Sequence, residues 1–160
     1  MVASARRTLG LKALVVDDEL TEESAAGRAV RGLVTELKRR DFDVVTAMAA
    51  DDAIAIIRSD PALQCILLDW DLGPDGHDLS TSVVEAVRQR NNHVPVFLMA
   101  DRSVASSVPA SIMAKVNDFV WMLEDTMVFV GGCVVAATLR YRGTVLPPMF
   151  AALTQFAQVH

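Results

Sequence analysis

The chain has 160 residues, 52% of them hydrophobic, and a mean hydropathy of +0.32, which suits one domain with a sizeable core and leaves no room for a second full domain. Its 15 Lys and Arg against 20 Asp and Glu give a net charge of −5, which argues against a surface that binds nucleic acid. The longest uncharged apolar stretch, residues 127–139, is too short to cross a bilayer, and the N-terminus lacks a signal sequence, so we expect a cytoplasmic protein without a membrane span.

The first half of the chain alternates between predicted strands and helices. Residues 12–18 (KALVVDD) predict a strand buried on both faces, and a helix with Thr21 as its N-cap follows. Residues 42–48 predict a second strand, and residues 50–60 a short helix that must end before Pro61. The third and most apolar strand, residues 64–70 (QCILLDW), leads into a loop rich in Gly, Pro and Asp.

The second half repeats this alternation. We expect a helix over 80–90, a strand over 94–100, a weak helix over 108–116, a strand over 118–124 and a long helix over 126–141. Five strands that alternate with five helices predict a parallel sheet covered on both faces. The predicted fold class is therefore α/β, a flavodoxin-like, doubly wound five-stranded parallel sheet in three layers, α/β/α.

The final stretch, RYRGTVLPPMFAALTQFAQVH, does not fit this pattern. Breaks at Gly143 and at Pro147 and Pro148 separate a new amphipathic segment, which predicts an extra C-terminal helix with one apolar face. A finished five-stranded domain has no position for this helix. We expect one domain over residues 1–142 and a linker with the start of a helix over 143–160, which either folds back onto the domain or leads to a further part of the protein.

Acidic residues gather at the predicted carboxyl ends of the strands, where α/β sheets bind ligands. These are Asp17, Asp18, Glu19, Asp69, Asp71 and Asp101. An acidic pair after the first strand and an aspartate after the third resemble the response-regulator receiver domain. That resemblance implies that Asp17, Asp18 and Asp69 hold Mg²⁺ and that Asp69 accepts a phosphoryl group, and carboxylates are ligands that a hard cation prefers.

Two positions depart from the receiver pattern, which requires a hydroxyl at the end of the fourth strand and a lysine at the end of the fifth. Ala100 and Met122 stand there. Without the cation, one like-charge contact at ~4 Å costs about 4 kcal/mol at an effective dielectric of 20. We therefore interpret Asp69 as a remnant and predict no catalytic or metal site; the alternative is an atypical stand-alone receiver phosphorylated on Asp69 with Mg²⁺.

Three stretches resemble a more specific family: PVFLMADRS (95–103), FVWMLEDT (119–126) and RYRGTVLPPMFAALTQFA (140–157). They are similar to the N-terminal wing domain of the bacterial inducible ornithine/lysine/arginine decarboxylases, which depend on pyridoxal phosphate (PLP). The resemblance covers nearly the whole chain. It implies a receiver-shaped, non-catalytic domain that joins subunits into rings of dimers, with its final stretch packed on the PLP-binding core. In some lysine-specific members it also implies a contribution to binding a guanosine-tetraphosphate alarmone.

The chain itself offers no lysine suited to the PLP Schiff base. Lys12, Lys38 and Lys115 lie in helix or strand-edge contexts without a glycine-rich phosphate cup. We therefore expect no cofactor and no enzymatic activity in this chain, and we expect its partners to be the catalytic core and the other subunits of a parent decarboxylase. The candidate interface residues are Trp121, Met149, Phe150, Leu153 and Phe156.

Overall fold

Five parallel strands form one sheet in the computed structural model, which describes residues 10–74 and 77–145. The strands are β1 (Leu11–Val16), β2 (Phe42–Ala47), β3 (Cys65–Asp69), β4 (Val96–Ala100) and β5 (Asp118–Trp121). Their order in the sheet is β2-β1-β3-β4-β5, and each neighbouring pair is parallel. The predicted doubly wound sheet is confirmed.

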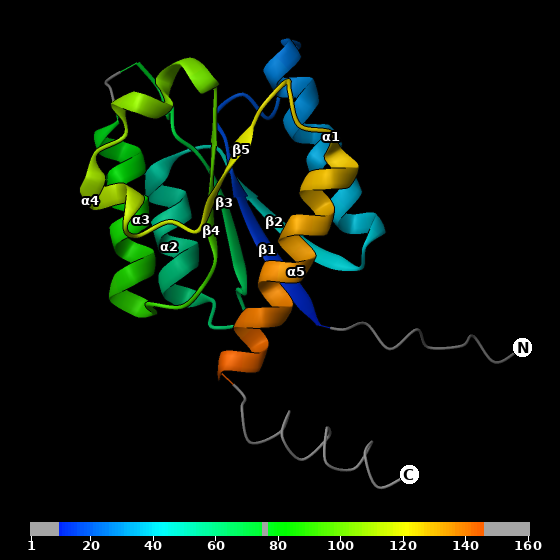
Figure 1. Cartoon of the computed structure of the whole chain (residues 1–160), viewed down its shortest axis with the longest axis vertical. Helices are drawn as coiled ribbons and strands as arrows, with labels where there is room; N and C mark the ends of the chain where they lie inside the picture. Colours follow the sequence, from blue (N-terminus) through cyan, green and yellow to red (C-terminus); the bar gives the residue numbers. More distant parts are fainter. Residues whose placement is uncertain (1–9, 75–76, 146–160) are drawn as a thin grey trace, which may run out of the picture.

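Helices cover both faces of this sheet (Figure 1). One layer holds α1 (Ala25–Arg39) and α5 (Met127–Val145), and the other holds α2 (Ala50–Ser59), α3 (Asp78–Arg90) and the single turn α4 (Ala110–Met113). A 3₁₀ helix over Arg102–Ser107 precedes α4. The three-layer α/β/α arrangement predicted from the alternating pattern is confirmed.

The central strands β1, β3 and β4 are mainly apolar because both of their faces are buried, whereas the edge strands β2 and β5 carry exposed polar residues such as Asp43 and Asp118. Alternate residues of β1 show this: Leu14 and Val16 enter the core under α2 and α3, while Ala13 and Val15 enter the core under α1 and α5. These side chains are fully buried, and a fully buried valine or leucine contributes about 1.5–3 kcal/mol. In these central strands the acidic residues come at or after the carboxyl end, as Asp17, Asp69 and Asp101 do.

The N-cap of α1 is Ser24, not Thr21 as predicted. The Ser24 hydroxyl accepts a hydrogen bond from the Gly27 backbone N–H at 3.0 Å. The preceding loop turns back on the helix, so that a Cβ at position 27 would collide with the carbonyl oxygens of Glu19 and Glu22. Only glycine fits at this approach, and the loop occupies the residues predicted as the first turn.

Strand β5 is shorter than predicted and ends at Trp121 rather than at residue 124. The carbonyl oxygen of Trp121 accepts hydrogen bonds from the N–H groups of Glu124 and Asp125 at 3.1 and 2.9 Å, and Leu123 has φ of 71°. In return, Asp125 Oδ2 accepts the Trp121 N–H at 2.9 Å. This tight turn ends the strand and sets Met122 at the end of the sheet.

Helix α5 continues through Gly143, where a break was predicted, to Val145. No helix within residues 10–74 and 77–145 is long and apolar enough to cross a membrane. The predicted C-terminal helix, with Met149, Phe150, Leu153 and Phe156, lies outside the described residues.

Candidate functional site

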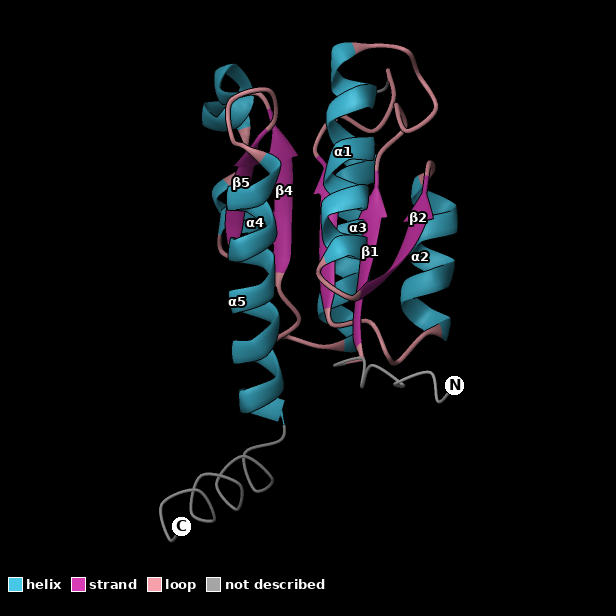
Figure 2. Ribbon diagram, turned by 90° about the vertical axis from the view of Figure 1, so that its right-hand side faces the viewer, coloured by secondary structure: helices cyan, strands magenta, loops and turns pink. Residues whose placement is uncertain are grey.

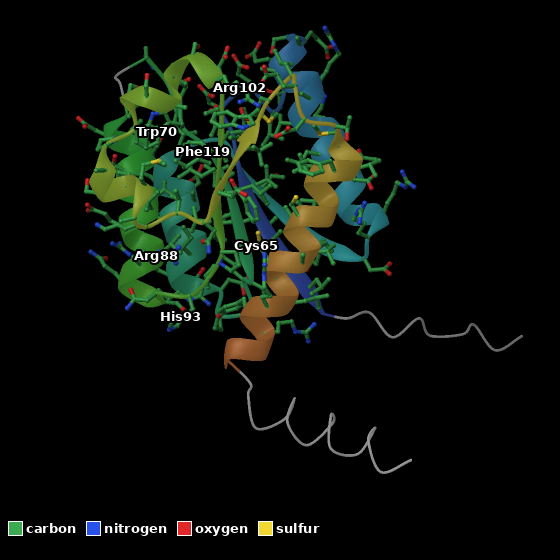
Figure 3. All side chains as sticks on the ribbon, in the orientation of Figure 1. Cys65, Trp70, Arg88, His93, Arg102 and Phe119 are labelled. Carbon is green, nitrogen blue, oxygen red and sulfur yellow. The ribbon has the colours of Figure 1, made fainter. Side chains whose placement is uncertain are left out.

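A cavity of about 360 Å³ opens at the carboxyl ends of the strands, beside β1 and β3, where the strand order reverses. It lies at the same end of the sheet as Trp70 and Arg102, while Arg88 and His93 are at the opposite end (Figure 3). Its lining includes all six acidic residues predicted at the rim: Asp17, Asp18, Glu19, Asp69, Asp71 and Asp101. The structure therefore brings the predicted acidic rim together in one hollow.

Three of these carboxylates form a tight group. One oxygen each from Asp17, Asp18 and Asp69 lie within 4.8 Å of one another. Asp17 is buried and the other two are half-buried. Backbone N–H groups fix the geometry: Glu19 donates to Asp17 Oδ1 at 2.8 Å, and Asp71 donates to Asp69 Oδ1 at 3.0 Å. Each turn after a strand thus orients its own aspartate.

The carboxylates in this group repel one another. Burial raises the pKa of Asp17 to about 6, and the negative charge of Asp18 adds to this effect. Burial also raises the pKa of Asp69 to about 9, and Asp17 contributes next through its charge. The N–H groups of Glu19 and Asp71 oppose these shifts without cancelling them. The site therefore favours a proton or another cation at this position.

A hard divalent cation fits this donor set, because three carboxylate oxygens converge within 4.8 Å. A phosphoryl group does not fit equally well. Ala100 and Met122 line the same cavity, at the positions where the receiver pattern requires a hydroxyl and a lysine. Among the described residues that line it, none is a lysine, arginine or histidine. The metal site itself stays a prediction of the receiver alternative.

Arg102 follows the acidic rim in sequence but does not line the cavity. Its Nε lies 2.7 Å from Glu124 Oε2, and its guanidinium carbon lies 5.0 Å from the centre of the Trp121 ring. The Trp121 ring also stacks on Phe119, with ring centres 4.9 Å apart. Arg102 is therefore held in an ion pair and a cation–π contact beside β5. The proposed interface role of Trp121 stays a prediction.

Several contacts that hold the backbone next to Asp69 could not be predicted from the sequence pattern. Trp70 is fully buried and stacks on His77, with ring centres 4.6 Å apart. The Ser80 hydroxyl donates to the carbonyl oxygens of Trp70 and Asp69, at 2.5 and 3.2 Å. These contacts fix the backbone next to Asp69 from α3, so Ser80 has a positioning role that its place near a helix start does not reveal.

The three lysines do not form a PLP site. Lys12 Nζ lies 2.6 Å from Asp60 Oδ2, and this ion pair raises the pKa of the lysine and lowers that of the aspartate. Lys115 Nζ lies 3.9 Å from Glu85 Oε1, and Lys38 is exposed on α1. Lys12 lies on β1, Lys38 on α1 and Lys115 in the turn after α4, and none of them lines the acidic cavity, so the described residues do not place these lysines together in a cofactor-binding pocket.

Comparison with known proteins gives a consistent set of matches. Residues 25–141 match the family described as Orn/Lys/Arg decarboxylase, N-terminal domain. The chain is 34% identical over 153 residues to the biodegradative arginine decarboxylase of Escherichia coli (strain K12), covering 94% of this chain and 20% of that protein. It is 26% identical to the lysine decarboxylase LdcA of Pseudomonas aeruginosa, covering 93% of this chain and 21% of that protein.

Solved structures match in fold. Lysine decarboxylase A from Pseudomonas aeruginosa superposes with a TM-score of 0.76 at 24% identity, over 92% of this chain and 20% of that one. The receiver domain of the Francisella response regulator 1452 superposes with a TM-score of 0.63 at 16% identity, over 81% of this chain and 98% of that one. The chain thus has the receiver fold, and it spans about a fifth of the decarboxylases that it matches.

Proposed function

The chain belongs to the Orn/Lys/Arg decarboxylase N-terminal domain family, and on this premise we propose that it is the non-catalytic wing domain of a PLP-dependent arginine, lysine or ornithine decarboxylase. In this role it joins subunits of the enzyme and contributes to their regulation. One observation carries the proposal: the acidic cavity keeps the carboxylates of a receiver but has Ala100 and Met122 in place of the groups that hold a phosphate.

Electrostatics explain why this cavity does not support phosphotransfer. A phosphoryl group on Asp69 would add negative charge beside Asp17 and Asp18, whose carboxylate oxygens are within 4.8 Å of the Asp69 oxygen. Phosphoryl transfer depends on cations that neutralise the charge on the phosphoryl oxygens. A bound Mg²⁺ would supply part of this charge, but Met122 offers no ammonium to complete it. The domain therefore acts through its surfaces.

A stand-alone receiver phosphorylated on Asp69 is the second candidate function. It is favoured by the receiver fold and by the group formed by Asp17, Asp18 and Asp69. The family match weighs against it, since relatives of 34% and 26% identity are decarboxylases of about five times the matched length. Treatment with acetyl phosphate and Mg²⁺ separates the two functions, since only a working receiver gains a phosphoryl group that Asp69→Ala removes.

The PLP chemistry belongs to the catalytic core of the proposed parent enzyme. PLP supplies the electron sink for decarboxylation when bound there. The alignment covers 94% of this chain but only 20% of the arginine decarboxylase, and two of the three lysines of the chain lie in ion pairs with Asp60 and Glu85. In our proposal the core and the neighbouring subunits are the partners of this domain.

A chimera tests the assembly role. The aligned fifth of the Escherichia coli arginine decarboxylase is replaced by residues 1–160, and the same enzyme with that fifth deleted serves as the control. We expect sedimentation velocity to show larger particles for the chimera than for the deletion, with PLP absorbance confirming a folded core in both. Equal particle sizes with PLP bound in both proteins would contradict the assembly role.

A further inference from the structure

Helix α5 has a second apolar face that nothing in the described chain covers. Its inner face packs on the sheet and α1 through Val130, Val134 and Ala137. On the outer face, Val128 and Phe129 are 62% and 61% exposed, and Leu139 is 40% exposed. Figure 2 shows α5 along the outside of the molecule. Since residues 127–139 contain no charged side chain, this helix lacks the polar outer face of a solvent-exposed surface helix.

Gly131 and Gly132 are adjacent in α5, but contacts within the described chain account for only one of them. A Cβ at Gly131 would lie 2.6 Å from Arg40 Nε and 3.1 Å from Glu36 Cγ, so a larger residue there would have to displace the Arg40 side chain, and this contact accounts for the glycine. A Cβ at Gly132 would meet nothing within 4 Å. A glycine inside a helix lowers its stability relative to alanine, yet no contact within the described residues requires Gly132. The small size of Gly132 can therefore serve only a contact on the side of α5 that faces away from the domain.

Gly132 lies at the centre of the outer face. Residues 129, 132, 136, 139 and 143 recur at helical spacing and so share that side of α5. Gly132 and Ala136 form a low central region, and larger side chains flank it: Val128 and Phe129 toward the start of the helix, Leu139 and Arg140 toward its end. Small residues at the centre of a helix face allow another helix to approach closely.

From this pattern we propose that α5 of a second copy of this chain packs antiparallel on this face, about a two-fold axis near residue 134. Gly132 of each copy then lies opposite Ala136 of the other, and the pair Val128 and Phe129 lies opposite the pair Leu139 and Arg140. The same patch serves both copies, as a two-fold interface requires. The inference rests on the proposed assembly function and names the partner of this surface.

Charge favours a second copy in this orientation. The region where α5 starts carries Glu124 and Asp125, and its last turns carry Arg140 and Arg142. In the antiparallel pair the acidic end of each helix lies beside the basic end of the other, whereas a parallel pair would set like charges together. Glu124 is paired with Arg102 at 2.7 Å, but its side chain is 53% exposed and so remains accessible to a cation from outside; Arg140 and Arg142 make contacts of their own within the chain.

Strand addition does not explain the same region. The edge strand β5 lies next to α5 (Figure 1), but two of its N–H groups are already bonded within the chain. Phe119 N–H donates to Asp118 Oδ1 at 2.8 Å, and Trp121 N–H donates to Asp125 Oδ2 at 2.9 Å. Such capping hinders pairing with another strand, so a helix on α5 is the better occupant.

Sedimentation of the full 160-residue chain over a range of concentrations tests the proposal. We expect a reversible monomer–dimer equilibrium. Gly132→Ala should raise the dissociation constant at least tenfold by separating the helices, while raising the melting temperature of the monomer. Ala136→Glu should leave a monomer with an unchanged circular dichroism spectrum. Gly32→Ala in α1 is the matched control, because its Cβ would make only an ordinary contact of 3.7 Å with Met127, and it should leave dimerisation unchanged.

A monomer at all concentrations, or dimers that Gly132→Ala and Ala136→Glu leave equally stable, would overturn the proposal. If the Ala136→Glu variant did not fold, Gly132→Ala would still test the proposed dimer, because replacing glycine with alanine stabilises a helix. Either negative result leaves the chimera experiment to judge the assembly function by itself. A chimera that assembles while α5 variants have no effect would place the subunit contact on another surface.

Discussion

Asp69 is the residue on which two accounts of this domain differ. Its carboxylate lies among acidic neighbours, it accepts the Asp71 N–H at 3.0 Å, and Met122 occupies the place of the expected ammonium. Asp17 and Asp69 both have raised pKa values, chiefly because of burial. A receiver-like set of carboxylates here destabilises the fold at neutral pH, since no cation among the cavity-lining residues balances it.

Asp69→Asn should therefore stabilise the protein as pH rises. The folded pKa of Asp69, about 9, is above the ordinary value of 3.8, so the folded state binds more protons and stability falls as pH rises toward that value. We expect the variant to exceed the native protein by roughly 2 kcal/mol at pH 8 and by much less at pH 4. Urea denaturation at both pH values measures the difference.

Asp43→Asn is the control for this experiment. Asp43 is exposed and lies 3.9 Å from Lys12 Nζ, so its substitution should change stability by less than ~0.5 kcal/mol at either pH. An Asp69→Asn protein that is less stable than the native protein at pH 8, or a difference that does not change with pH, would show that the carboxylate is not under repulsion.

At the scale of elements, α1 and α5 are joined by a partly buried ion-pair group. Glu36 is buried and accepts from Arg40 Nε at 2.9 Å and from Arg39 Nη1 at 3.1 Å. Arg40 also donates to the Val128 carbonyl oxygen of α5 at 3.0 Å. Arg40 passes over Gly131, so the two helices approach at a position where α5 has no side chain.

Gly131→Ala should destabilise the domain by about 1–2 kcal/mol, because the new methyl group would displace Arg40 from Glu36. Gly132→Ala is the neighbouring control, and it should stabilise the monomer by up to ~1 kcal/mol. Thermal unfolding of both variants at a concentration where the chain is monomeric provides the comparison. Effects of the same sign at the two positions would contradict the assignment of Gly131 to the α1–α5 contact.

Arg88 joins α3 to the connections that precede β4 and β5. Its guanidinium donates to the carbonyl oxygens of Val94 and Lys115, both at 2.8 Å, and its burial lowers its pKa. Arg88→Ala should cost about 2 kcal/mol in urea denaturation, since it leaves partly buried carbonyl groups without donors. Arg28→Ala, which removes an exposed contact to the Glu23 carbonyl oxygen, should cost less than ~0.5 kcal/mol. Equal costs would refute the role of Arg88.

Most elements could be predicted because their signals are local. The strands β1, β3 and β4 are mainly apolar runs with acids at their carboxyl ends, so the common edge of the central strands follows from the sequence, and Ala100 and Met122 line the cavity as expected. Helix α5 continues through Gly143 because a glycine costs only about 1 kcal/mol in a helix, too little to end it.

Other features depend on tertiary contacts. Ser24 replaces Thr21 as N-cap because the preceding loop packs against Gly27, and Trp121 ends β5 because Asp125 caps its N–H. The contact of Ser80 with the Trp70 carbonyl oxygen joins residues ten positions apart. No periodicity or spacing encodes such pairs, so they could not be predicted from the sequence.

At the scale of the whole molecule, the chain combines the receiver fold with membership of the decarboxylase N-terminal domain family. The sheet and the layers are those of the receiver fold, while the acidic cavity has no lysine, arginine or histidine among its described lining residues. The unusual surface is elsewhere, on the apolar outer face of α5. We therefore propose that the domain acts through surfaces that contact other subunits rather than through the cavity.

The most direct test of this account is the intact mass of the chain after treatment with acetyl phosphate and Mg²⁺. We predict no added phosphoryl group on the native chain under conditions that fully label a working receiver domain. Restoring the two missing groups with Ala100→Thr and Met122→Lys should allow some labelling, since the carboxylates are already in place. A native chain that gains one phosphoryl group, and loses this gain in Asp69→Ala, would contradict the account.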